Sequence, residues 1–584
     1  MSTDMPLEGS PRVPSRSDRL APLLIVLAGL NWCFQVLWFW RYCGRNINAD
    51  AVSYIGIARH IAAGDFKASV HGYWSPLISW LIAATSPIAN DRTLAARILM
   101  QLLFATCLVL AYWLTYRLWG SRVLAAVVVL WFSLARGVAA FSVCFIGADL
   151  LLTACVLAYF ILLLGCLEKP DSLGKWLALG LAHALAFLAK AISFPLFAFT
   201  TVLAVALSRR GSAKKAAVTL VCAAIFPVLT AAGWGTAIRQ KYHVFTSGYQ
   251  LRFNLLDPAV KRAANHGGLA VLHDARPVYD DFMVSDQMPP DSPIWRVQVW
   301  RPALVGQVLQ KEGQNIPQAL KELLVLLTPG GILALLLGTI QMTRGRRQAQ
   351  RRFRFAWIVL FTTGALVLAY CMLVFDGRYV LPITPVLMAL SVRFAAPSAK
   401  AFEASADVER IEAAGRWQTL AAILLVVGLI GVQLYWASPF RTMRQDFQRS
   451  LYDAANGLRK GQARSLVVIG EGPYPEHGVG WEAGVYSSYF AGARVVGDLF
   501  EEPSEAEPGK VVPGNVAAGK VDADAVVADV GKLTPDAVLI WDLPPHPKYS
   551  GVVSKIQKVY PEASTSTIRD PLRGNVGTLI LLKR

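Results

Sequence analysis

Charged residues stand at the ends of several long apolar runs, where a charge is costly to place. Three are carboxylates (Asp50, Asp149, Asp376) and three are cations (Arg97, Lys190, Arg378). A carboxylate in such a place can take a proton from a hydroxyl group, and Arg or Lys can hold an anionic group by charge-assisted hydrogen bonds. Placing an ionisable group at this depth costs free energy, and such groups usually have a function. Their shared depth predicts one site for proton transfer on an anionic substrate.

Composition places this site in a membrane protein. The chain has 584 residues, of which 54% are hydrophobic and 16% are charged, with a mean hydropathy of +0.43. A soluble domain usually carries about 25% charged residues. Lys and Arg total 57 against 39 for Asp and Glu, but they cluster in short loops between apolar runs. One continuous basic face is absent from this pattern, so we expect no nucleic-acid partner.

The fold class expected is a multi-span α-helical membrane protein. A spanning helix needs about 20 mostly apolar residues, and about eleven runs satisfy this rule. The fifth and sixth are short and are also compatible with one broken span. The first run lacks a clear cleavage site, so we expect an uncleaved span. The runs are 21–41, 94–117, 121–141, 148–166, 175–190, 192–208, 214–236, 320–341, 354–375, 378–396 and 417–437.

Basic loops set the expected orientation. The most basic short loops are 208–215, 343–354 and the segment around 393–416, and positive loops remain on the cytoplasmic side. This orientation divides the chain into a cytoplasmic tail, a transmembrane domain and an outside domain. Their ranges are 1–20, 21–438 and 440–584, with outer loops at 42–93 and 237–319.

The segment after 440 changes from apolar runs to alternating short elements. Strand-like stretches lie at 465–470, 493–499, 537–543 and 578–583, and helix-compatible stretches lie at 481–492 and 551–560. This pattern predicts a small α/β domain outside the membrane. The Gly-rich stretch at 470–480 lacks the spacing of a nucleotide-binding loop, and 501–520 reads as a loose loop.

Cysteine and histidine positions give no support for a structural metal site. All eight Cys lie in or beside apolar segments, and none follows Cys371. We therefore expect buried thiols, no disulfide framework and no Cys-based zinc site. The stretch 273–282 has two His/Asp elements but no helix-spaced HxxxH, so we predict no metal site there either.

The first outer loop carries the most informative polar stretch. After Asp50, the apolar residues over 52–61 form an imperfect helical stripe that is too short and too polar to span a membrane. A helix lying in the interface fits this pattern, and 71–87 gives a second, aromatic piece of the same kind. The two helices would lie on the membrane surface and cover it, with Asp50 at their edge.

Several candidate residues have a structural explanation beside the functional one. Lys190 can snorkel to the headgroups, Asp149 can be stabilised at a helix N-terminus, and Asp376 and Arg378 can form a surface turn. Tyr54 lies one helical turn beyond Asp50, where it either touches substrate or packs. His71 either contacts substrate or is a plain interfacial side chain. Arg252 and Asn254 belong either to a sugar site or to a folded lid.

Five stretches in this order resemble the GT-C superfamily of integral-membrane glycosyltransferases, in the bacterial branch of protein O-mannosyltransferases and the lipid A aminoarabinose transferase. Together they cover most of residues 20–396. They are "DAVSYIGIARHIAAGDF", "WSPLISWLIAATSPIANDRTLAARILMQLL", "FIGADLLLTA", "GLAHALAFLAKAISFP" and "DGRYVLPITPVLMAL".

The resemblance implies transfer of a sugar from a polyprenyl-phosphate donor to a glycan, lipid or protein acceptor at the periplasmic face of a bacterial inner membrane. The family's essential acid falls on Asp50, and its pattern makes Arg97 the closest cationic correspondence. Many members have a second acid where this chain has Ala51. The resemblance therefore implies no definite cofactor. It leaves open a divalent cation that assists the reaction.

The chemistry follows from the residues. Displacing a phosphate from sugar C1 passes through an oxocarbenium-like state, so Asp50 is the candidate general base and one direct displacement would invert the anomeric centre. Cations would hold the leaving phosphate. The expected substrate-binding residues are Tyr54, His71, Arg97, Asp149, Lys190 and Arg378.

Two other classes of protein remain open from the sequence. The alternative function is a transporter or flippase of a lipid-linked substrate, although the two halves show no convincing internal repeat. A non-catalytic membrane scaffold for cell-envelope assembly is the third reading, and the missing second acid at Ala51 is its support.

Overall fold

A computed structural model gives the fold of the protein. The residues that it describes are 20–43, 47–89, 91–135, 138–208, 212–250, 273–274, 313, 315–327, 331–333, 335–336, 347–371, 377–395, 447–469, 489, 494–499, 522–541, 549–570 and 574–582.

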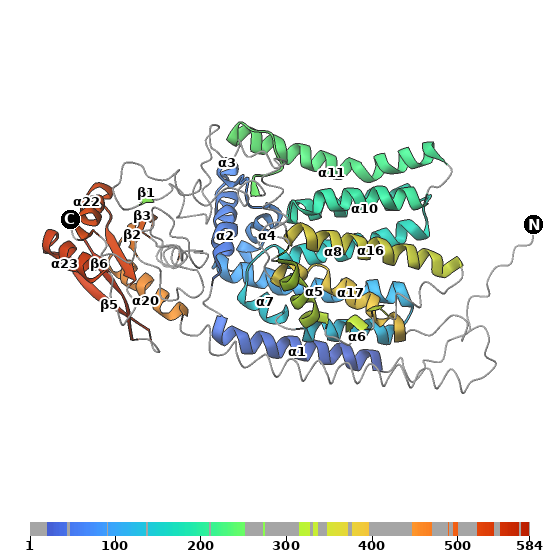
Figure 1. Cartoon of the computed structure of the whole chain (residues 1–584), viewed down its shortest axis with the longest axis horizontal. Coiled ribbons are helices and arrows are strands. Elements are labelled where there is room, and N and C mark those ends of the chain that lie inside the picture. Colours follow the sequence, from blue (N-terminus) through green and yellow to red (C-terminus); the bar gives the residue numbers. More distant parts are fainter. Residues whose placement is uncertain are drawn as a thin grey trace, which may run out of the picture.

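A bundle of apolar helices makes up most of the described chain, with the long helices lying side by side (Figure 1). Among the described residues, five helices are long and apolar enough to cross a membrane: α1, α5, α8, α11 and α16. The protein is therefore a multi-pass membrane protein. The helices are α1 (Leu20–Cys43), α2 (Ala49–Ala62), α3 (Phe66–Ser69), α4 (Leu77–Thr85), η2 (Ser86–Ile88), α5 (Arg92–Trp119), α6 (Arg122–Leu134), α7 (Val138–Cys144), α8 (Asp149–Glu168), α9 (Leu173–Ala189), α10 (Ser193–Ser208), α11 (Ala213–Tyr242), α16 (Arg347–Cys371), η3 (Gly377–Val380), α17 (Thr384–Ser391) and η4 (Val392–Ala395).

The predicted spans match these helices unevenly. The third run, 121–141, is divided between α6 and α7, and 378–396 is divided among η3, α17 and η4. Much of 320–341 and all of 417–437 lie outside the described residues. The number of spans therefore stays a prediction.

The fifth and sixth predicted runs form a helical hairpin, so the alternative of one broken span is wrong. In one continuous helix, residues 11 apart would be separated by about 16 Å along the axis. Instead, the His183 ring in α9 lies 5.3 Å from the Phe194 ring in α10, and His183 Nε2 is 3.0 Å from the Phe194 carbonyl oxygen. The chain therefore turns back at Lys190.

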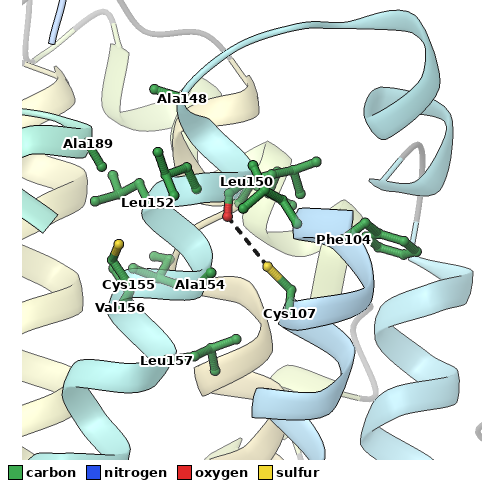
Figure 2. Packing of buried hydrophobic residues seen from close by; sticks show 14 of the residues in the cluster. Phe104, Cys107, Ala148, Leu150, Leu152, Ala154, Cys155, Val156, Leu157 and Ala189 are labelled. Atoms are coloured by element: carbon green, nitrogen blue, oxygen red, sulfur yellow. Dashed lines mark hydrogen bonds between the residues drawn. The ribbon is translucent and has the colours of Figure 1, made fainter. Parts of the chain in front are cut away.

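Helix α8 forms the centre of the bundle. Almost all of its residues are buried, as expected of a helix that is apolar on every side. Figure 2 shows it packed against α5, where the Cys107 thiol donates to the Leu150 carbonyl oxygen at 3.5 Å. This packing fixes the depth of Asp149, the first residue of α8.

The cysteines follow the prediction only in part. Cys107, Cys155, Cys166 and Cys371 are buried free thiols, whereas Cys33 is exposed. Cys144 is disulfide-bonded, so the expectation of a buried thiol is wrong at this position. The physical reason is tertiary: α7 packs against α1, and Phe39 of α1 forms an apolar cluster with Val143 and Cys144.

A six-stranded sheet lies beyond one end of the bundle (Figure 1). The strands are β1 (His273–Asp274), β2 (Ser465–Ile469), β3 (Arg494–Leu499), β4 (Ala537–Trp541), β5 (Ser564–Asp570) and β6 (Gly574–Leu581), in the order β1-β3-β2-β4-β6-β5. Strands β3, β2 and β4 are parallel, and the other pairs are antiparallel. The helices of this part are α20 (Phe447–Lys460), α22 (Ala523–Leu533) and α23 (Ser550–Val559).

The sheet buries both of its faces. Because side chains alternate along a strand, Val467 and Ile469 pack with the cluster that includes residues of α22 and α23. Leu466 and Val468 belong to the other cluster, which contains Leu451 of α20. The four strands expected from the sequence correspond to β2, β3, β4 and β6, and the helix expected at 551–560 corresponds to α23.

Other features of this part were not predicted or are not described. Strand β5 and helices α20 and α22 were not predicted, and β1 comes from the long loop 237–319 to pair with β3. Only residue 489 of the helix expected at 481–492 is described, and the stretches 470–480 and 501–520 lie outside the described residues.

Among the described residues, Tyr489, which lies between β2 and β3 in the chain, contacts the bundle. The Tyr489 hydroxyl lies 2.9 Å from Thr93 Oγ1 at the start of α5, and the Arg59 guanidinium of α2 lies 4.9 Å from the centre of the Tyr489 ring. We call this end of the bundle the sheet end. It also carries the N-terminus of α8 and the turn between α9 and α10, because Asp149 and Lys190 are paired with each other and Arg378 links Asp149 to Asp50 of α2.

Close packing of α9 on α11 leads to a stability prediction. A Cβ atom at Gly180 would lie 2.4 Å from the Ala223 carbonyl oxygen, so Gly180→Ala must push the two helices apart. We expect a loss of about 1–3 kcal/mol in the free energy of unfolding. Thermal unfolding of the purified protein in detergent measures it. Gly233→Ala in α11 is the control, because nothing lies within 4 Å of that position. Equal stability of the two variants would contradict the packing argument.

Candidate functional site

Helix α2 brings Asp50 to the sheet end of the bundle. Figure 1 shows α2 running across the ends of the long helices, as expected of a helix at the membrane surface. Residues 51–58 are all buried, however, so α2 is covered on more sides than an interfacial helix with one wet face. Asp50 lies in its first turn. The carboxylate is therefore held at the rim of a covered region.

Four charged side chains from distant parts of the chain form a continuous cluster, which we call the four-charge cluster: Asp50, Asp149, Lys190 and Arg378. Arg378 Nη1 donates to Asp50 Oδ2 at 2.6 Å, and Arg378 Nε lies 4.0 Å from Asp149 Oδ2. Lys190 Nζ donates to the other oxygen of Asp149 at 2.5 Å. The sequence predicts all four residues, and the structure brings them together.

Burial decides which members of the cluster can meet a ligand. The side chain of Asp149 is only 2% exposed, whereas those of Asp50, Lys190 and Arg378 are 16–18% exposed. A buried carboxylate is tolerated when it is paired, and Asp149 has two cations around it. Asp149 is therefore the inner anchor, and the other three side chains form the accessible edge.

Aromatic rings line the cations of the cluster. The Tyr379 ring centre lies 4.8 Å from Lys190 Nζ and 5.3 Å from the Arg378 guanidinium carbon, and Phe145 lies on Arg378 at 4.5 Å. Tyr370 stacks on Tyr379 with centroids 4.4 Å apart. Cation–π contacts of this kind hold a guanidinium or ammonium in place while leaving its hydrogen-bond donors available. Sequence reasoning missed these rings, although Tyr379 directly follows Arg378.

Tyr54 lies beside the cluster and packs against Trp74, with ring centroids 5.1 Å apart. Burial raises the pKa of its phenol above the usual range, and the negative charge of Asp50 raises that pKa further. The hydroxyl group therefore keeps its proton. It can donate a hydrogen bond to an anion, but it cannot serve as a base.

His71 lies buried in the turn before α4. Its Nδ1 accepts from the backbone N–H groups of Tyr73 and Trp74 at 3.0 and 3.4 Å, and the residue is 1% exposed. Tyr249 contributes a neighbouring ring with a centroid separation of 6.1 Å. These contacts support a structural role for His71 in the turn before α4.

Arg97 is buried behind the segment that leads into α8. Its Nη1 donates to the Val143 carbonyl oxygen at 3.3 Å, and its guanidinium carbon lies 5.5 Å from the Trp40 ring centre. It is 2% exposed. Phe145, two residues after Val143, contacts Arg378 of the cluster. Arg97 therefore supports the same segment from another position.

The cluster does not fit a divalent cation. Among the described residues, no group of three or more His, Cys, Asp or Glu side chains is placed to hold a metal ion. Asp50 and Asp149 are each already bound to Arg or Lys, and these cations neutralise the charge that would attract a metal. The candidate residues Arg252, Asn254 and Asp376 lie outside the described residues.

Known proteins share this architecture. Residues 73–234 match the family described as dolichyl-phosphate-mannose-protein mannosyltransferase. The apo structure of ArnT from Cupriavidus metallidurans is similar with a TM-score of 0.53 and 12% identity, over 96% of this chain and 98% of that one. The same protein bound to undecaprenyl phosphate has a TM-score of 0.52 and 14% identity, with the same coverage. The chain therefore has the fold of ArnT.

A second solved protein has the same fold. The oligosaccharyltransferase of Archaeoglobus fulgidus, in its apo form, has a TM-score of 0.56 and 12% identity, over 89% of this chain and 69% of that one. No curated protein sequence matches the chain. The range matched by the family, 73–234, contains Asp149 and Lys190. The other two residues of the four-charge cluster, Asp50 and Arg378, lie outside that range.

The buried pair of the cluster leads to a stability prediction. Lys190→Gln removes the ammonium group from a carboxylate that is 2% exposed, and we expect a loss of about 3 kcal/mol in the free energy of unfolding. Lys555→Gln is the matched control, because its ion pair with Asp524 is largely exposed and should contribute at most about 1 kcal/mol. Chemical unfolding in detergent measures both. Equal effects would show that Lys190 is not needed to compensate Asp149.

Proposed function

We propose that the protein transfers a sugar from a polyprenyl-phosphate-linked donor to an acceptor at the periplasmic face of a bacterial inner membrane. The observation that carries this proposal is the four-charge cluster at one end of a GT-C bundle. It combines a carboxylate that can accept a proton with cations that can hold a phosphate. Both groups are needed for displacement of a phosphate from a sugar.

The reaction we propose is one direct displacement. The acceptor oxygen bonds to sugar C1 as the bond from C1 to the phosphate oxygen breaks, and the phosphate leaves with the electron pair. Asp50 takes the acceptor proton. Arg378 and Lys190 stabilise the charge on the leaving phosphate, and Arg is suited to bidentate contact. Attack opposite the leaving group inverts the anomeric centre.

The remaining candidate residues have supporting roles in this scheme. Tyr54 donates a hydrogen bond to the bound donor, because its hydroxyl group keeps its proton. Asp149 holds Lys190 and Arg378 in place. Arg97 and His71 stabilise the segments around the site through their backbone contacts.

Two features favour an enzyme of this kind over a transporter. Transporters bind substrate near mid-depth, at broken helices in repeated halves. Here Asp50, Asp149 and Lys190 gather at one end of the bundle instead. ArnT, which has the same fold, has been seen with undecaprenyl phosphate bound, and this supports a lipid-linked donor. Hexosyl and pentosyl donors are both compatible with the cluster.

The disulfide at Cys144 supports the orientation. Disulfides form and persist in oxidising compartments such as the periplasm, and α7 lies near the sheet end in Figure 1. At the opposite end, Lys169 lies in the turn between α8 and α9, Arg122 begins α6, and Lys214 and Lys215 lie in the first turn of α11, as expected of a cytoplasmic end. The two observations independently favour a periplasmic site.

Asp50→Asn tests the proposed base. We expect purified protein with this substitution to fold and to lose at least about 10²-fold in turnover, because an amide cannot take the acceptor proton. The assay follows consumption of undecaprenyl-phosphate-linked sugars from a panel of hexoses, pentoses and amino sugars, with cell-envelope lipid extract as acceptor. Asp65→Asn is the control, since Asp65 caps the neighbouring helix α3 and lies outside the cluster. Wild-type turnover by folded Asp50→Asn protein would refute the assignment.

Single-cysteine labelling tests the orientation. Lys67 at the sheet end and Lys169 at the opposite end are both exposed. In intact cells with a permeabilised outer membrane, a membrane-impermeant maleimide should label Lys67→Cys and leave Lys169→Cys unlabelled. Both variants should react after the cells are lysed. The reverse pattern would place the cluster at the cytoplasmic face.

A further inference from the structure

Asn48 joins the two segments that carry the carboxylates of the four-charge cluster. Its Nδ2 donates to the Ile146 carbonyl oxygen at 3.0 Å, and its Oδ1 accepts from the Ile146 N–H at 2.9 Å. The side chain therefore satisfies both backbone groups of one residue almost a hundred positions away. A primary amide offers a donor and an acceptor side by side, as this contact requires. Asn48 lies two residues before Asp50, and Ile146 lies three residues before Asp149.

The position of Asn48 makes this contact unusual. Asn48 is the N-cap of α2, where an Asn side chain ordinarily accepts from a backbone N–H in the first turn of its own helix. Here the side chain makes no such capping bond. Helix α2 therefore lacks the stabilising hydrogen bond of a side-chain N-cap. The Asn48 amide instead bonds to the segment before α8.

The segment held by Asn48 is tightly built. A Cβ atom at Gly147 would lie 2.4 Å from the Phe145 ring and 3.5 Å from Asp149 Oδ2, so no larger side chain fits there without movement. Phe145 lies on the guanidinium group of Arg378. One amide therefore fixes the start of α2 relative to a short segment that carries both Asp149 and the ring under Arg378.

We propose that Asn48 is a positioning residue that sets the separation of Asp50 and Asp149, so that Arg378 reaches both carboxylates. This inference rests on the proposed sugar transfer. Arg378 Nη1 is 2.6 Å from Asp50, and Arg378 Nε is 4.0 Å from Asp149, so a small shift of α2 breaks one contact or the other. A misplaced base slows the displacement step, while Lys190, paired with Asp149, and Arg378, held between Phe145 and Tyr379, still bind the phosphate.

The experiment compares Asn48→Ala with Asn31→Ala. Asn31 is a matched control because its amide donates to the Ser133 carbonyl oxygen at 2.9 Å, between α1 and α6 and outside the cluster. We measure kcat and KM with the panel donor that the wild type consumes, the Kd of undecaprenyl phosphate, and the melting temperature. For Asn48→Ala we expect kcat to fall about 10–100-fold, with KM and Kd within about 3-fold of wild type. Asn31→Ala should have a melting temperature similar to that of Asn48→Ala, but its kcat should be close to that of the wild type.

Asn48→Asp keeps the shape of the side chain and can still accept from the Ile146 N–H, but it cannot donate to the carbonyl oxygen. It provides a folded test if Asn48→Ala is unstable, and we expect a loss in kcat of the same order. A kcat within 2-fold of wild type in a folded Asn48 variant, with Asp50→Asn inactive, overturns the positioning role alone. An equal kcat loss in Asn31→Ala also overturns it. Full activity of Asp50→Asn would instead refute the proposed base.

Discussion

The pairing of buried opposite charges is the constraint on which this structure depends. Arg378 lies between Asp50 and Asp149, and Lys190 takes the second oxygen of Asp149. None of these charges would be stable alone at the edge of an apolar bundle, since removing one partner of a buried pair leaves an uncompensated charge. Four segments that are far apart in the sequence must therefore meet at one place.

The other elements at the sheet end hold these four segments in place. Helix α8 is buried on nearly every side, so its first residue cannot move without disturbing the core. The hairpin of α9 and α10 puts Lys190 at its turn, where the backbone ends one helix and begins the next. Aromatic rings of Tyr379 and Phe145 hold the two cations without consuming their hydrogen-bond donors. The site is thus both anchored and reachable.

The same pairing gives the first carboxylate a cation as its partner. Ala51, directly after Asp50, is fully buried and supplies no second acid. Asp50 has Arg378 as its partner instead of a neighbouring carboxylate. In the proposed reaction, the positive charge needed at the leaving phosphate would come from Arg378 and Lys190.

The sequence by itself determined the class of the protein and the membership of the charged site. Apolar runs report the membrane environment directly, and Asp50, Asp149, Lys190 and Arg378 stand out because charges at such positions are rare. Four strands of the sheet were also visible, because alternation has a local period.

Only the tertiary structure decided how those residues are partnered. The sequence singled out Arg97 more strongly than Lys190, yet Arg97 binds the Val143 carbonyl oxygen and Lys190 binds Asp149. The α9–α10 hairpin, the disulfide at Cys144, the addition of β1 to the sheet and the Asn48–Ile146 contact were likewise not determined by local pattern. Each depends on contacts between segments distant in the chain. Hydrophobic periodicity records which residues are buried, but not which of them face one another.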